Sequence, residues 1–264
     1  MSAPTADGIF WLANSRIDGK PLVLVLRGAE AARKERDAGA NSKTGAMVQS
    51  YIMRADIEPQ EAARIGEDYS VCGDCVHRPR LVRQGNGAAP CYVKLFHGPR
   101  VVWDAFQRGA YPRAFSVDTL RAYCAGLPVR MGTYGDPGAL HTATWRALLS
   151  GASDRTGYTH RWRDTGEGLR GLAMASVDSI GERDEASAAG WATFRVATDR
   201  AEAAQRVRGE ARCPASAEAG QRVTCRTCPL KCDGASGGRV IIDHGAGGEG
   251  RRIARELQAR GVRR

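Results

Sequence analysis

Cysteine residues supply the clearest chemistry in this chain of 264 residues, which contains eight of them. Four follow the spacing Cys213-x11-Cys225-x2-Cys228-x3-Cys232. Two thiolates separated by two residues can bind one metal, because a tight turn directs both sulfurs toward the same point. Four thiolates complete the ligand set of a structural zinc ion or of a [4Fe–4S] cluster. The spacing predicts a metal centre and leaves both metals open.

A second set precedes it, formed by Cys72-x2-Cys75, His77 and Cys91. With His77 as the fourth ligand, the three thiolates would make a closed zinc site. Without it, they would hold a [4Fe–4S] cluster with one iron open to a substrate or cofactor. The two sets could also form a single site. The remaining Cys124 lies alone in a helical stretch, and we expect it in the core.

Charge and hydropathy limit the classes of protein to consider. The net charge is +10, which favours attraction to nucleic acid, whereas the even spread of the arginines favours a compositional origin. No run of about 18 apolar residues is present, so we expect no membrane span. The first residues show no export signal, so we expect a protein in the cytoplasm of a bacterial host. Cysteine pairs there are metal ligands or redox groups rather than stable disulfides.

The pattern of apolar residues divides the chain into two parts. Residues 1–66 contain strand patterns at 22–26 and 48–54 and a short helix at 59–66, which predicts a small β-rich unit. Residues 67–264 alternate strands with helices, which predicts a parallel sheet covered by helices. No Gly-x-Gly-x-x-Gly follows the first strand, so we favour a partial or complete (β/α) barrel over an open doubly wound sheet.

The expected elements of this second part are short. The strands are expected at 91–94, 129–132, 156–160, 172–177, 192–196, 211–213 and 240–243. The helices are expected at 99–109, 117–125, 137–150, 182–189, 199–207 and 249–260.

Polar residues follow several of the expected strands. In parallel architectures the functional groups gather at the C-terminal ends of strands. We therefore expect one shared site formed by the residues after the expected strands: Tyr134, Gly135, Asp136, His160, Arg161, Trp162, Ser176, Asp178, Arg195, Thr198, Cys213, Asp243 and His244. We expect His160, Asp136 and Arg195 to line a pocket and carry catalysis. Asp178 with Glu182 suggests paired carboxylates or, alternatively, a helix cap.

The loop Gly132-Thr133-Tyr134-Gly135-Asp136-Pro137 lies between an expected strand and an expected helix. Its backbone amides could bind an anionic cofactor at the helix N-terminus, with Gly132, Tyr134 and Gly135 as the binding residues. The alternative is a helix cap in which Asp136 accepts from the first turn and Pro137 is the first helical residue. The chain has no phosphate-binding P-loop, no Gly-x-Ser-x-Gly elbow and no zinc-deaminase pattern.

The order of short motifs resembles a family of cysteine-rich proteins encoded by phages and prophages. The resemblance covers residues 47–243 through CGDC-x-HR, PCYV, VRMGTYGDP, GYTHRW, MASVD, GWATFRV, RCPAS and TCRTC. The order of cysteines, strand–helix repeats and further cysteines also resembles radical-SAM barrels, which implies S-adenosylmethionine as a cofactor. Those barrels carry C-x3-C-x2-C in one loop, whereas here the third cysteine lies 16 residues beyond Cys75.

Two hypotheses follow for the function. The first is an iron–sulfur or zinc metalloprotein that acts as a radical-SAM-like enzyme on a nucleotide or nucleic acid. The second is a zinc protein without enzymatic activity that binds DNA or RNA, with binding that weakens steeply as salt rises.

Overall fold

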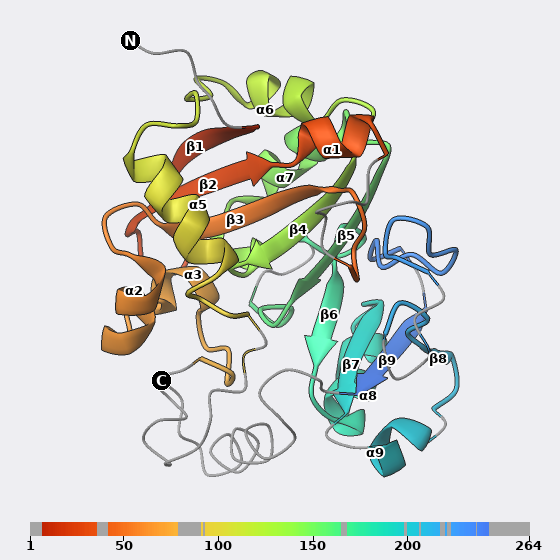
Figure 1. Ribbon diagram of the computed structural model, residues 1–264. Helices are drawn as coiled ribbons and strands as arrows, with labels where there is room; N and C mark the ends of the chain where they lie inside the picture. The colour runs from red at the N-terminus through yellow and green to blue at the C-terminus, as the bar shows by residue number, and fades with distance from the viewer. Residues whose placement is uncertain are drawn as a thin grey trace.

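A nine-stranded mixed sheet organises the part of the chain that the computed structural model describes (Figure 1). The strand order is β1-β2-β3-β4-β5-β6-β7-β9-β8. This order begins at β1 and ends at β8, so the described strands form an open sheet rather than a complete barrel. The described residues are 7–35, 42–78, 91, 93–164, 168–197, 200–205, 207–216, 220, 223–235 and 237–242.

The first three strands form an antiparallel meander, β1 (Gly8–Asn14), β2 (Pro21–Arg27) and β3 (Val48–Arg54). Residues 22–26 of β2 are fully buried, which explains their uninterrupted apolar sequence. The predictions for β2 and β3 are confirmed, and β1 was not predicted. Three short helices belong to this part of the chain: α1 (Ala29–Arg33), α2 (Pro59–Ile65) and α3 (Tyr69–Cys72).

The later strands are parallel to β3 and to one another. They follow the order of the chain except that β9 lies between β7 and β8. Their bounds are β4 (Pro128–Tyr134), β5 (Asp154–Thr159), β6 (Met174–Val177), β7 (Thr193–Ala197), β8 (Glu210–Arg212) and β9 (Gly238–Ile242). Because β3 pairs with β4, the sheet is continuous across residue 66, the boundary expected between the two parts.

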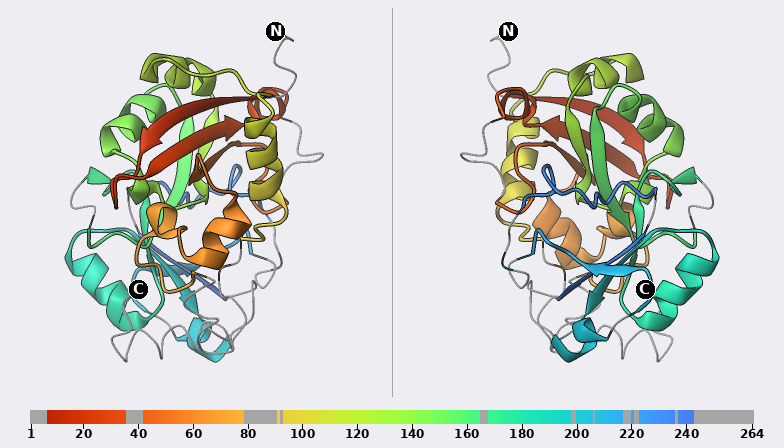
Figure 2. Two further views of the ribbon diagram at one scale, coloured as in Figure 1. Left: turned by 90° about the vertical axis from the view of Figure 1, so that its left-hand side faces the viewer. Right: turned by 90° about the vertical axis from the view of Figure 1, so that its right-hand side faces the viewer.

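Helices cover both faces of the sheet, as Figure 2 shows for α5 on one side and α7 on the other. The core between these layers includes the fully buried side chains of Leu24, Ile52, Trp145 and Leu148. The helix bounds are α5 (Gly98–Gln107), α6 (Val117–Cys124), α7 (Thr142–Leu149), α8 (Ile180–Ala188) and α9 (Arg200–Ala204).

Two of the expected elements differ from the structure. The strand expected at 91–94 is wrong for the described residues there, which form no strand. The single helix expected at 137–150 is a 3-10 turn η1 (Pro137–Ala139) followed by α7. The chain is extended at Leu140 and His141, and the Trp145 indole N–H donates to the Pro137 carbonyl at 2.9 Å. The helix expected at 249–260 lies outside the described residues.

Candidate functional site

Asp136 connects the C-terminal ends of two adjacent parallel strands. It follows β4, and its carboxylate accepts from the Thr159 hydroxyl at 2.6 Å and from the His160 backbone N–H at 2.8 Å, both at the end of β5. The same carboxylate accepts from the Gly138 N–H at 2.7 Å, so it also caps η1. Asp136 therefore caps the turn that begins at Pro137, which was the alternative to an anion-binding loop in the sequence analysis. It also fixes the position of His160.

Asp178 follows β6 and brings two histidines together. Its Oδ2 lies 2.9 Å from His77 Nε2 and 3.7 Å from His160 Nε2. The two imidazole rings meet edge to face with their centroids 5.2 Å apart. His77 and Asp178 are buried, and the His160 side chain is 29% exposed. The expected convergence of strand-end residues is thus found for Asp136, His160 and Asp178.

Two hydrogen bonds at the start of α8 hold Asp178 in place. The Asp178 backbone N–H donates to Glu182 Oε2 at 2.8 Å, and the Glu182 N–H donates to Ser179 Oγ at 3.1 Å. Ser179 is the N-cap and satisfies an amide of the first turn that the helix itself leaves without a partner. Glu182 lies in this capped turn and orients Asp178 through its backbone.

The early cysteines lie on a tight turn beside this group. α3 ends at Cys72, and Gly73 follows with φ 58° and ψ −136°. The Asp136 N–H donates to the Val71 carbonyl at 3.0 Å, which joins this turn to the end of β4. This backbone conformation favours glycine, because residues with a Cβ rarely adopt a positive φ with this ψ.

The early thiols influence one another. Burial, followed by the charges of Asp68, Cys75 and Cys91, raises the pKa of Cys72 well above its ordinary value. Burial raises the pKa of Cys75 in the same way, and the His77 backbone N–H that donates to its sulfur opposes this. The three early cysteines are thus neighbours in space, although Cys91 is 16 residues from Cys75.

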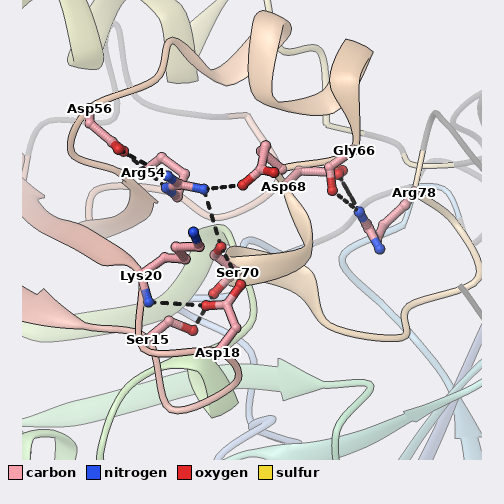
Figure 3. A network of polar contacts seen from close by, with 10 residues as sticks. Ser15, Asp18, Lys20, Arg54, Asp56, Gly66, Asp68, Ser70 and Arg78 are labelled. Carbon is pink, nitrogen blue, oxygen red and sulfur yellow. Dashed lines mark hydrogen bonds and ion pairs between the residues drawn. The ribbon is translucent and has the colours of Figure 1, made fainter.

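Arg78 fastens the cysteine turn to the preceding segment. Its guanidinium donates to Asp68 Oδ1 at 2.6 and 3.0 Å, to the Gly66 carbonyl at 2.6 Å and to the Gly73 carbonyl at 3.2 Å. Figure 3 shows this contact next to a second group of polar residues centred on Arg54. In that group Arg54 binds Glu67 at 2.6 Å and Asp56 at 2.9 Å. Ion pairs at the two residues before α3, Glu67 and Asp68, and the hydrogen bond to Gly73 after it therefore hold the helix that carries Cys72.

The C-terminal end of β4 and Gly135, the residue that follows it, pack tightly against their surroundings. Gly132 and Gly135 have φ of 66° and 83°, and a Cβ on Gly135 would lie 2.6 Å from the Ile52 carbonyl oxygen. Tyr134 is buried, and burial, then the charge of Cys72, raises its pKa well above its ordinary value. Gly132, Tyr134 and Gly135, which the sequence predicted to bind a cofactor, therefore lie in a packed region next to β3, α3 and the early cysteines.

Arg195 lies in a different neighbourhood from His160. It is fully buried on β7, and its guanidinium donates to both carboxylate oxygens of Glu210 at 2.9 and 2.7 Å. Its Nη1 lies 3.8 Å from Glu202. Among the described residues its charged partners are these two glutamates, so the structure does not bring Arg195 together with His160 and Asp136.

Three of the late cysteines lie in one apolar cluster with Tyr158 and Phe194. Cys213 is buried in that cluster, and Cys225 and Cys232 are partly buried against it. Cys228 is also buried, and its charge acts on Cys213. Burial raises the pKa of Cys232 to about 12, with a hydrogen bond from Tyr158 opposing and the charges of Cys213 and Cys225 adding to the rise. The loop docks on the N-terminal part, since the Cys225 N–H donates to the Lys43 carbonyl at 2.9 Å.

The spacing of ligand atoms separates the candidate centres. Within the described ranges, His77, His160 and Asp178 are the one group of three or more metal-binding side chains whose ligand atoms lie within 4.8 Å of one another. The sulfurs of neither cysteine set meet this limit. Because a Zn–S bond is about 2.3 Å, thiolates on one zinc ion lie at most about 4.6 Å apart. The sulfur atoms within the early set, and those within the late set, are therefore too far apart in this structure to bind one zinc ion together.

Cys124 is fully buried in α6, as the sequence predicts, and burial raises its pKa to about 12. Alkylating reagents attack thiolates that they can reach. We therefore expect iodoacetamide to leave Cys124 unmodified in the native protein and to modify it after unfolding in urea, as measured by peptide mass spectrometry. Modification of Cys124 in the native state at the rate seen in urea would contradict its placement in the core.

Comparisons with protein-family models, with curated proteins and with solved structures yield no match. No helix among the described residues is long and apolar enough to cross a membrane. Sequence reasoning did not assign roles to Thr159 and Arg78, and it named Arg161 only as one of the residues after an expected strand. The position of Thr159 at the end of β5 and that of Arg78 beside the cysteine pair are the signals that could have selected them.

Proposed function

We propose that this chain is an iron–sulfur enzyme in which Cys72, Cys75 and Cys91 hold a [4Fe–4S] cluster with one iron open to a ligand. Cys213, Cys225, Cys228 and Cys232 would hold a second, auxiliary centre. The observation that carries the proposal is the position of the early cysteine turn, which lies beside Asp136, His160 and Asp178 at the C-terminal edge of the parallel strands.

The order of the strands supports a barrel-like sheet. From β3 to β7 the parallel strands follow the chain without reversal. Doubly wound sheets reverse their order at a switch point, whereas barrel sheets add each strand to the same side of the previous one. The functional groups of a partial barrel lie at the C-terminal ends of its strands, where the cysteine turn is found.

The chemistry around the early thiols suits a cluster better than one zinc ion. Each thiolate of a four-iron cluster binds a different iron atom, so the sulfurs need not lie within the span of a single metal. Cys75 also accepts a backbone N–H from His77, and hydrogen bonds to the sulfurs are one means by which proteins tune such clusters. The cation of Arg78 lies close enough to interact with Cys72 and Cys75. A bound cluster would supply electron transfer and an open coordination position.

An anionic substrate fits the residues beside the turn. The Arg161 guanidinium lies against Gly73, and its Nε is buried without a hydrogen-bond partner among the described residues. Arginine binds phosphate groups through two parallel hydrogen bonds. With the net charge of +10, these features support a nucleotide or nucleic acid as the substrate. The resemblance to radical-SAM barrels makes S-adenosylmethionine the ligand to test at the open iron.

Anaerobic purification followed by iron and acid-labile sulfide analysis tests the proposal. We expect iron and sulfide in the wild-type protein, loss of part of both in a Cys72→Ser/Cys75→Ser/Cys91→Ser variant, and unchanged content in Cys124→Ser. Added S-adenosylmethionine is expected to perturb the electron paramagnetic resonance spectrum of the reduced early cluster. A colourless protein that contains zinc alone would refute the iron–sulfur proposal.

A zinc protein that binds DNA or RNA is the second candidate. Burial raises the pKa of Cys225, and the charges of Arg130 and Lys43 oppose this rise, so two basic groups lie near the late cysteine loop. If this second candidate is correct, the purified protein contains zinc. It also binds duplex or single-stranded oligonucleotides, and this binding weakens steeply as the salt concentration rises. No binding at low salt would exclude it.

A further inference from the structure

We propose that His77, His160 and Asp178 form a mononuclear site for a divalent transition metal, separate from the cysteine centres. Metal–nitrogen and metal–oxygen bonds of about 2.0–2.2 Å place neighbouring ligand atoms about 3.0–3.5 Å apart. The Asp178 oxygen lies 2.9 Å from one imidazole nitrogen and 3.7 Å from the other. The three ligand atoms are thus already near the separation that a bound ion requires.

The donor set narrows the class of metal. Two imidazoles and one carboxylate occupy part of a coordination sphere and leave positions open, the pattern of non-haem Fe(II) sites. Carboxylates also suit Mn²⁺, whereas thiolates favour softer ions. We therefore expect Fe²⁺ or Mn²⁺ in this site. The ion would need no cysteine, so the proposal stands whether or not the early thiols hold a cluster.

Carboxylates that are not ligands hold two of the three ligands in place. Asp136 binds the His160 N–H and the Thr159 hydroxyl, and Glu182 binds the Asp178 N–H. Metal ligands are commonly oriented by partners outside the coordination sphere, and losing one weakens metal affinity by about 10–100-fold. The segments that carry His160 and Asp178 are thus positioned by groups that remain outside the coordination sphere.

The three ligand atoms are enclosed by protein. His77 and Asp178 are buried, and the Nε2 atom of His160 is buried although its side chain as a whole is 29% exposed. An ion would therefore enter past the exposed part of the His160 ring. The ordinary alternative is a buried His–Asp hydrogen bond that only stabilises the fold. A bound ion would replace the proton in the hydrogen bond between His77 Nε2 and Asp178 Oδ2, whereas in the alternative that proton stays in place.

Manganese binding tests the site directly, because free Mn²⁺ gives a six-line electron paramagnetic resonance signal that is lost on binding. The metal-free full-length protein is titrated with Mn²⁺ under anaerobic conditions. We expect one equivalent to bind tightly, and His160→Gln to weaken binding by at least about tenfold. Asp178→Asn, which can keep the hydrogen bond to His77, is expected to do the same. The control is His141→Gln, which removes an exposed histidine from the start of α7 and should leave the affinity unchanged.

Two further variants separate this proposal from the proposed function. Asp136→Asn is expected to weaken Mn²⁺ binding by about 10–100-fold through His160. Cys72→Ser/Cys75→Ser/Cys91→Ser is expected to lose cluster iron and retain the Mn²⁺ site. Circular dichroism and thermal unfolding establish that each variant is folded. No Mn²⁺ or Fe²⁺ binding by the folded wild type, or equal binding by the wild type, His160→Gln and Asp178→Asn, would overturn the site.

Discussion

Replacing Glu210 by alanine is expected to lower the free energy of unfolding by about 3–5 kcal/mol, because it leaves the Arg195 guanidinium buried without its main counter-charge. The Arg195 and Glu210 side chains are 0% and 1% exposed and form a bidentate pair between β7 and β8. Removing one partner of such a pair costs far more than the pair contributes, since the remaining charge cannot reach water. Urea unfolding at neutral pH measures the change.

The exposed pair of Arg163 with Glu185 is the matched control. It has the same bidentate geometry at 2.8 and 2.5 Å, but its side chains are 41% and 54% exposed. We expect Glu185→Ala to cost less than about 1 kcal/mol, because water solvates both charges. Equal losses for Glu210→Ala and Glu185→Ala would show that Arg195 is not buried as described.

Gly135→Ala is expected to destabilise the protein by about 2–5 kcal/mol. The positive φ of 83° costs an alanine about 1–2 kcal/mol. The new methyl group would also lie 2.6 Å from the Ile52 carbonyl oxygen and 2.7 Å from Val71 Cγ1, and overpacking of this kind costs about 1–3 kcal/mol more. Thermal or urea unfolding detects the loss. The displaced loop is also expected to weaken Mn²⁺ binding, because Asp136 is the next residue.

Gly171→Ala measures the part of the destabilisation that comes from the positive φ alone. Gly171 has a similar φ of 78°, and nothing lies within 4 Å of the position of its Cβ. Its replacement is expected to cost about 1–2 kcal/mol. If Gly135→Ala cost no more than Gly171→Ala, the close packing of the loop against β3 and α3 would be wrong.

The strands and their order along the chain could largely be predicted from local patterns. The buried run of β2 and the short apolar runs of β4 to β7 are periodic signals that depend on neighbouring residues alone. β1 was missed because GIFWLAN lacks a clear alternation, and its pairing with β2 decides its structure. The open form of the sheet depends on long-range pairing, which no local pattern reports.

The candidate site was predicted in part. The rule that strand ends converge predicted that Asp136, His160 and Asp178 would lie close together, and they do. It misplaced Arg195, because residue type and position cannot reveal that Glu210 on β8 binds its guanidinium. His77 was expected among the cysteine ligands, and the structure places it on Asp178, which is 101 residues away. Partners at such separations are decided by the fold rather than by spacing in the sequence.

The docking of the late cysteine loop has a consequence for the order in which the protein assembles. Arg226 donates to the carbonyls of Ala32 and Ala46, which lie 194 and 180 residues earlier in the chain. Contacts at such separations form late in folding, because a long stretch of chain must be ordered before they gain stability. During synthesis the early cysteine turn emerges well before this loop does. Under the proposed function, the early cysteine set would therefore be able to bind its cluster while the later set is still being made.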